Sequence, residues 1–111
     1  MSKATIYLNA WNETFASKSS KSLESVLDDS FELQNPRTNT VSSKKEHIEW
    51  CLREGPNEIA DYKMIYEEDG IMIGTHSAIF ENEKWLVMYF GKEVNGKLVE
   101  WIINSGPVEK T

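Results

Sequence analysis

The sequence has little of what several large classes of protein need. Its 111 residues include one cysteine, Cys51, so no disulfide can form within the chain, which is typical of a protein kept in a reducing compartment. No apolar run approaches the roughly 20 residues of a membrane-spanning helix, and the first residues lack the charged and apolar blocks of a signal peptide. We therefore expect a soluble, cytoplasmic protein that does not enter a membrane.

Basic residues are also scarce. The chain has 12 Lys and Arg residues against 18 Asp and Glu, which gives a net charge of −6. Because nucleic acids are bound by clustered positive charge, this balance argues against a nucleic-acid-binding protein. The histidines and the cysteine are scattered, and the sequence has neither a glycine-rich phosphate loop nor a nucleophile elbow. We expect no metal site and no cofactor.

What the sequence does have is the composition of an ordinary globular protein, with 40% hydrophobic and 27% charged residues. A chain of this length builds one core, so we expect residues 1–111 to form a single domain. Apolar side chains three or four residues apart predict a helix over 3–17, and a shorter apolar group predicts a second helix over 23–27. Alternating residues then predict a strand over 31–34, followed by a loop over 36–42.

The second half of the chain begins with the best-marked helix. Ser43 and Glu46 have the spacing of a capping box, and a Gly-Pro pair ends the helix that they start. Stretches rich in β-branched and aromatic side chains then predict strands over 58–66, 71–80, 85–94 and 97–105. Each junction carries turn residues, and Asn95-Gly96 is the strongest hairpin signal. Consecutive hairpins form a meander, so the pattern predicts an α+β fold with a mainly antiparallel sheet.

The strand over 85–90 is apolar on both faces, which is unusual for an antiparallel strand with one side in water. One face carries Leu86, Met88 and Phe90, and the other carries Trp85, Val87 and Tyr89. If the helices cover only one face, an apolar patch stays exposed on the other, and such patches commonly mark interfaces. We predict a homodimer through the face with Trp85, Val87, Tyr89 and Ile102. Alternatively, the aromatic rings partly cover their own sheet.

Four segments resemble parts of a known superfamily. Residues 27–36 include the Asp-Asp pair, the strand and an Asn-Pro in place of the superfamily's Asp-Pro, and residues 43–52 fit its third helix. Gly74-Thr75-His76 and the segment 95–101, Asn-Gly-Lys-Leu-Val-Glu-Trp, are similar to two of its strands. In this order they resemble the nuclear transport factor 2-like superfamily, and within it the SnoaL-like and ketosteroid isomerase-like proteins. The resemblance implies a cone-shaped, curved, mainly antiparallel sheet around three N-terminal helices, the cystatin-like α+β roll.

The resemblance also implies a pocket between the helices and the sheet. Matching positions place nine residues around it: Trp11, Phe15, Leu33, Asn35, Cys51, Met88, Phe90, Trp101 and Ile103. Large apolar side chains with few polar groups are typical of small-molecule sites, so the expected ligand is a hydrophobic small molecule. The alternative is that these side chains simply fill the core, and for Phe15 and Leu33 we favour the core.

The carboxylates of the best-known enzymes of this superfamily are absent. Those enzymes move a proton next to a carbonyl with a carboxylate base, but this chain has Asn35 at one such position and Met88 or Phe90 at the other. An amide cannot act as a base, although it can orient a ligand through hydrogen bonds. His76 is the remaining candidate for a general base, because histidine titrates near neutral pH. Strand parity leaves open whether His76 faces the pocket or the dimer side.

The other reactive residue types suggest no site. His47 lies beside Glu46 and Glu49 on the third helix, so we predict that it is solvated. Cys51 belongs to the buried stripe of the same helix and has no positive neighbour to lower its pKa, so we expect it to be inert.

Two functions of different class follow from these observations. The first is a small-molecule-binding domain with an aromatic pocket, in which any reaction would be a cofactor-independent isomerisation, dehydration or cyclisation. The second is a non-catalytic module that dimerises or binds a protein partner through its sheet face. A packed interior without a titratable group favours the second function, and an open pocket reached by His76 favours the first.

Overall fold

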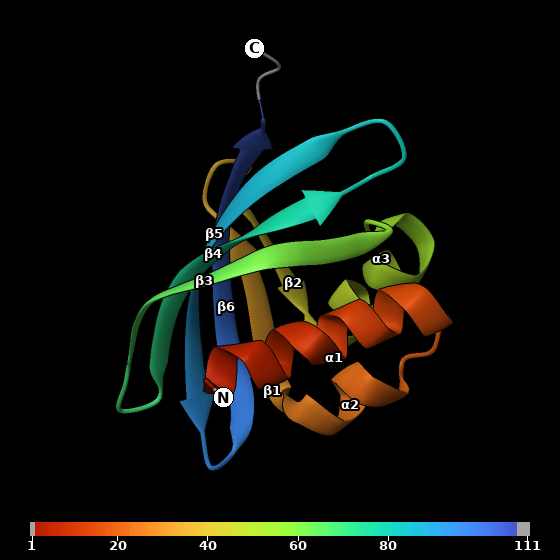
Figure 1. The fold of residues 1–111 in the computed structure, drawn as a ribbon. Helices are drawn as coiled ribbons and strands as arrows, with labels where there is room; N and C mark the ends of the chain where they lie inside the picture. Colours follow the sequence, from red (N-terminus) through yellow and green to blue (C-terminus); the bar gives the residue numbers. More distant parts are fainter. Residues whose placement is uncertain (1, 109–111) are drawn as a thin grey trace.

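The computed structural model describes residues 2–108, which form three helices and one six-stranded sheet (Figure 1). The helices are α1 (Lys3–Ser17), α2 (Lys21–Val26) and α3 (Lys44–Glu54). The strands are β1 (Leu27–Asn35), β2 (Thr40–Ser43), β3 (Glu58–Glu68), β4 (Ile71–Ile79), β5 (Lys84–Val94) and β6 (Lys97–Pro107). They follow the order β2-β1-β6-β5-β4-β3, and every neighbouring pair is antiparallel except β1 and β6. The predicted α+β fold is confirmed.

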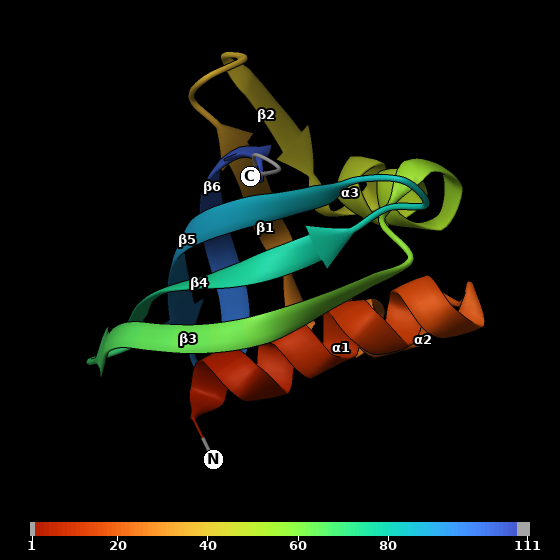
Figure 2. The same cartoon turned by 45° about the horizontal axis from the view of Figure 1, so that its top comes forward.

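The sheet is strongly curved and holds the helices on its concave side. β3, β4 and β5 run crosswise to β1 and β6, and they arch over α1 (Figure 2). α1 contacts β3, α2 and α3, so it is the central element beneath the sheet. The two ends of the strand order, β2 and β3, do not pair with each other, so the sheet stays open rather than closing into a barrel.

The helix boundaries follow the capping signals in the sequence. Ser2 caps α1, because its Oγ accepts a hydrogen bond from the amide of Thr5 at 3.1 Å. The predicted capping box of α3 is present: Ser43 Oγ accepts from the amide of Glu46, and the Glu46 carboxylate accepts from the amide of Ser43. With Ser43 as its N-cap, α3 begins at Lys44, as the capping box predicts.

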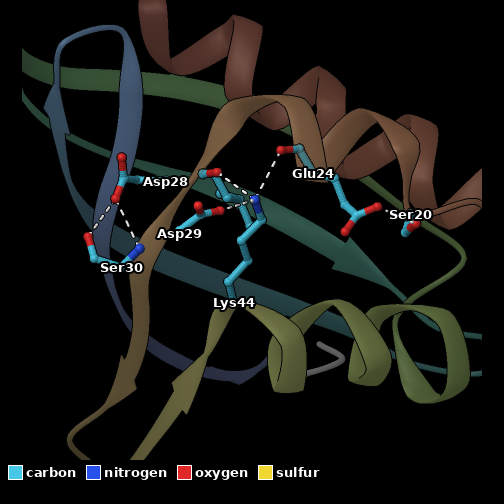
Figure 3. A network of polar contacts seen from close by, with 7 residues as sticks. Ser20, Glu24, Asp28, Asp29, Ser30 and Lys44 are labelled. Carbon is cyan, nitrogen blue, oxygen red and sulfur yellow. Dashed lines mark hydrogen bonds and ion pairs between the residues drawn. The ribbon is translucent and has the colours of Figure 1, made fainter.

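Lys44 ties the start of α3 to the turn between α2 and β1 (Figure 3). Lys44, the first residue of α3, donates from Nζ to the carbonyl oxygens of Glu24 at 3.1 Å and Leu27 at 2.9 Å, where α2 ends and β1 begins. Its Nζ also lies 3.4 Å from Oδ1 of Asp29. These bonds satisfy carbonyl groups that the end of a helix leaves without partners. The start of α3 is thereby tied to the turn between α2 and β1.

Two strands differ from the sequence prediction. β1 spans nine residues rather than the four predicted over 31–34, and β2 begins inside the segment predicted as a loop over 36–42 and ends at Ser43. β2 is polar and largely exposed, and it is a strand because its backbone pairs with β1 from Glu32↔Ser43 to Asn35↔Thr40. The four later strands were placed within a few residues. The predicted Asn95-Gly96 turn is confirmed by the positive φ angles of both residues, 52° and 82°.

The core lies between α1 and the concave face of the sheet. Its fully buried side chains include Leu8, Leu23, Phe31 and Tyr89. A glycine on β5 makes room for one of its rings: a Cβ on Gly91 would lie 2.5 Å from the indole of Trp101. This close approach of backbone and ring fixes how Trp101 lies against the sheet.

The inward and outward faces of β5 are the reverse of those assumed in the dimer prediction. Val87 and Tyr89 point inward and are 8% and 2% exposed, whereas Leu86 and Met88 point outward and are 53% and 51% exposed. The sequence alternation is correct, but a strand that is apolar on both faces gives no signal for which face is inside. Inward placement lets Tyr89 stack on Trp101, with ring centroids 4.6 Å apart and planes 11° apart. A dimer face built from Trp85, Val87 and Tyr89 is therefore wrong.

Candidate functional site

A cavity of about 390 Å³ opens between the helices and the concave face of the sheet, and we call it the aromatic cavity. Its volume lies within the range of small-molecule sites. All four tryptophans of the chain line it, two from the sheet and two from helices α1 and α3. The full lining consists of Leu8, Trp11, Phe15, Leu33, Asn35, His47, Trp50, Pro56, Ile59, His76, Ala78, Phe80, Glu83, Trp85, Val87, Trp101, Ile103 and Ser105.

A continuous row of five rings borders the cavity, and all of them except Tyr89 belong to its lining. Trp11 lies 4.8 Å from Trp101 between ring centroids, and Trp101 stacks on Tyr89. His76 lies 6.0 Å from Tyr89 at one end of the row, and His47 lies 5.8 Å from Trp11 at the other. Rings packed in this way are held in place by one another, so the row is preorganised before a ligand arrives.

His47 is buried, which corrects the prediction that it is solvated. Its side chain is 5% exposed and lies on the inner face of α3, one turn from Cys51. The indole Nε1 of Trp11 donates to Nε2 of His47 at 2.8 Å. Because an indole N–H can only donate, Nε2 carries the lone pair and Nδ1 carries the hydrogen. Burial lowers the pKa of His47 to about 4, so the ring is neutral at pH 7.

Cys51 lies beneath His47 rather than in the lining of the cavity. It is fully buried, and its Sγ lies 3.4 Å from Nε2 of His47. Burial raises the pKa of the thiol to about 12, so no thiolate forms near neutral pH. The thiol has the environment of the inert, buried cysteine that the sequence predicts.

His76 faces the cavity from β4. It is 7% exposed, and its Nδ1 lies 3.1 Å from the carbonyl oxygen of Ser77. Since that carbonyl can only accept, Nδ1 carries the hydrogen and Nε2 has a free lone pair. Burial lowers the pKa of His76 below its ordinary value, so the ring is neutral at pH 7. A neutral imidazole with one nitrogen anchored can accept a proton or a hydrogen bond at the other.

Asn35 is the last residue of β1 and brings an amide into the cavity. Its Oδ1 is buried and has no hydrogen-bond partner among the described residues. A buried acceptor without a partner costs about 1–3 kcal/mol. A ligand that donates a hydrogen bond to this oxygen would recover that cost.

The aromatic cavity contains most of the residues that the sequence assigned to a pocket. Trp11, Phe15, Leu33, Asn35, Trp101 and Ile103 line it. Met88 and Phe90 do not, because they lie on the convex face of β5, and their assignment to the pocket is corrected. The sequence prediction missed His47, Trp50, Glu83 and Trp85. Assigning the other face of β5 to the pocket would have included Trp85. No sequence pattern distinguishes the buried His47 from a solvated histidine.

The described residues meet neither the requirements of a metal site nor those of a membrane-spanning helix. Between residues 2 and 108, no group of three or more His, Cys, Asp or Glu side chains is arranged to hold a metal ion. None of the helices in that range is both long enough and apolar enough to span a membrane.

Solved structures share this arrangement of helices and sheet. A protein from Kribbella flavida proposed to be a ketosteroid isomerase superposes with a TM-score of 0.78 at 9% identity, covering 96% of this chain and 81% of the other. An NTF2-like protein of unknown function from Burkholderia xenovorans gives 0.73 at 15% identity, covering 95% and 84%. IdmH from Streptomyces antibioticus, proposed to be a polyketide cyclase, gives 0.69 at 12% identity, covering 94% and 92%. The chain has the NTF2-like fold.

This result confirms the fold that the sequence resemblance implies. It rests on structure alone, since no family model and no curated protein matches the sequence. Within this fold the aromatic cavity lies between the curved sheet and α1, and Glu83 is the one lining residue that bears a carboxylate.

Proposed function

We propose that this NTF2-like chain binds a small hydrophobic molecule in the aromatic cavity. The observation that carries the proposal is a preformed space of about 390 Å³ whose lining is mostly apolar, contains all four tryptophans and includes an unpartnered buried acceptor, Asn35 Oδ1. Sites of this kind, apolar with a few fixed polar atoms, are typical of small-molecule recognition. The two histidines and Asn35 would orient the ligand within the cavity.

Any reaction in the cavity would be acid–base chemistry without a cofactor. His76 is the residue we propose as general base, because its Nε2 lone pair is free and its ring is neutral at pH 7. Asn35 would hold the substrate through hydrogen bonds. Isomerisation, dehydration and cyclisation can each begin with removal of a proton next to a carbonyl, and the activities proposed for the Kribbella and Streptomyces proteins support that reaction class.

A titration with the neutral dye N-phenylnaphthylamine, whose fluorescence rises in apolar sites, tests ligand binding. Ile103→Trp places a larger side chain in the cavity, and we expect it to weaken dye binding about tenfold or more, since the cavity would lose space for the dye. Ile102→Trp makes the same change on the opposite face of β6 and should leave binding unchanged. Equal dye binding by both variants would contradict the proposal.

The convex side of the sheet supports a second proposal, association into a homodimer. It carries an apolar patch, which we call the outer face: Ile73, Leu86, Met88, Phe90 and Ile102. Ile102 belongs to the dimer face predicted from the sequence, and the other members replace Trp85, Val87 and Tyr89. Leu86 and Met88 are more than half exposed, and an apolar patch of this kind is typical of an interface.

A further inference from the structure

Several polar atoms around the aromatic cavity are hydrogen-bond acceptors. Asn35 Oδ1 has no partner, His76 presents the Nε2 lone pair, and Glu83 contributes a carboxylate at the exposed rim. Two indole N–H groups that could donate to a ligand are already used within the protein. Trp11 donates to His47, and Trp85 donates to Glu83 Oε2 at 2.7 Å. The lining keeps side-chain donors as well, namely the Asn35 amide, Nδ1 of His47, the indole N–H groups of Trp50 and Trp101, and the hydroxyl of Ser105.

The charge of the cavity lining is negative. Glu83 is the one lining residue with a charged side chain at pH 7, because both lining histidines are neutral and no lysine or arginine belongs to the lining. The whole chain has a net charge of −6. An anionic ligand would therefore bring a second negative charge to the rim without a positive partner among the lining residues.

The tryptophan rings favour a positive ligand as well. The face of an indole is the most favourable of the aromatic side chains for a cation. One indole of the cavity already has a cation above it: the guanidinium carbon of Arg37 lies 6.0 Å from the ring centroid of Trp85. Arg37 is exposed and is not part of the lining, so a ligand entering the cavity would reach other indole faces.

We propose that the ligand is a protonated amine with an apolar body. This inference rests on the proposed function, because it names the chemical class of the molecule that the aromatic cavity takes. The apolar body packs on the row of rings, the ammonium lies near the indole faces and the Glu83 carboxylate, and its N–H groups donate to acceptors such as Asn35 Oδ1. A neutral ketone of the same shape would leave that acceptor without a partner.

Three probes with the same phenyl group separate the charge states: phenethylamine, phenethyl alcohol and hydrocinnamate, which are cationic, neutral and anionic at neutral pH. Tryptophan fluorescence reports binding directly, since all four tryptophans line the cavity. We expect the amine to bind about tenfold more tightly than the alcohol, and the carboxylate to bind more weakly than the alcohol. Equal affinities for amine and alcohol, or tighter binding of the carboxylate, would overturn the amine proposal.

A charge-neutralising variant tests the role of the rim. Glu83→Gln keeps the shape of the side chain and an oxygen that can accept from Trp85, and it should weaken binding of the amine several-fold more than binding of the alcohol. Glu81→Gln is the matched control, because it makes the same change in the same turn at an exposed residue outside the lining. The same loss of preference in both variants would overturn the specific role of Glu83.

The neutral dye separates this inference from the proposed function. If the dye binds and is blocked by Ile103→Trp, but phenethylamine shows no advantage over the alcohol, the cavity is a binding site and the amine proposal is wrong. If neither the dye nor any of the three probes binds, both proposals are wrong.

Discussion

His47 shows how one buried side chain links the cavity to the stability of the fold. Its neutral form accepts the hydrogen bond from Trp11, and a protonated ring would place a charge among apolar groups and lose that acceptor. The folded state therefore binds this proton less tightly than the unfolded chain does. The contribution to stability is complete above the ordinary pKa of 6.5 and is lost as the pH falls towards about 4.

This linkage predicts an acid-sensitive fold. Between pH 7 and pH 5, His47 should reduce the free energy of unfolding by about 2 kcal/mol, and His47→Gln should remove that part of the pH dependence because glutamine does not titrate. Urea denaturation at the two pH values measures it. His76→Gln is the control, since it leaves His47 in place and should keep the larger part of the loss. The same pH dependence in the wild type and in His47→Gln would contradict the prediction.

Among the elements, α1 matters most for the site because it carries Trp11 and Phe15. Its first turn is held by the sheet: the carboxylate of Glu67 on β3 accepts from the backbone amides of Lys3 at 3.2 Å and Ala4 at 2.9 Å. The carboxylate of Glu93 on β5 accepts from Nζ of Lys3 at 2.8 Å. Acidic groups at a helix N-terminus satisfy free amides and interact favourably with the helix dipole.

Glu67→Ala should destabilise the protein by about 0.5–2 kcal/mol, the range for loss of a helix cap. Glu68→Ala is the matched control, because Glu68 is the next residue of β3 and its carboxylate accepts from the exposed hydroxyl of Tyr66. Chemical denaturation of the two variants measures the difference. If both lose the same free energy of unfolding, the carboxylate of Glu67 does not act as a cap.

Signals that act locally predicted their elements well. The capping box of Ser43 and Glu46 marked α3, and Asn95-Gly96 marked the last hairpin. Features that depend on partners distant in the chain were missed. β2 is a strand because it pairs with β1, and its own residues carry no apolar alternation. His47 is buried because Trp11, 36 residues away, donates to it.

At the scale of the whole molecule, the sheet is apolar on both sides, and that symmetry explains why the site was predicted only in part. The concave face is covered by α1 and surrounds the aromatic cavity, and the convex face carries the outer face. Period-two alternation divides β5 correctly into two sets, but choosing the inner set requires knowing which rings stack. Tyr89 on Trp101 decides it, and neither residue alone indicates that contact.

The same two-sided sheet gives the prediction for assembly. If the outer face forms a symmetric homodimer, Met88→Glu would bury a charge without a partner, and the symmetric copy would bring a second negative charge to the same interface. Since Met88 is 51% exposed in the single chain, the variant should fold normally, with an unchanged circular dichroism spectrum. Sedimentation velocity at micromolar concentration should show a dimer for the wild type and a monomer for Met88→Glu.

Ile6→Glu provides the control for this experiment, because Ile6 is also about half exposed, at 51%, but lies on α1. That variant should remain dimeric, since it adds the same charge at a similar degree of exposure outside the outer face. A monomeric wild type would contradict the dimer, and dissociation of both variants would show that added negative charge, rather than the outer face, controls association. A dimer that only Met88→Glu separates would place the interface on the convex side and leave the aromatic cavity on the opposite side of the sheet.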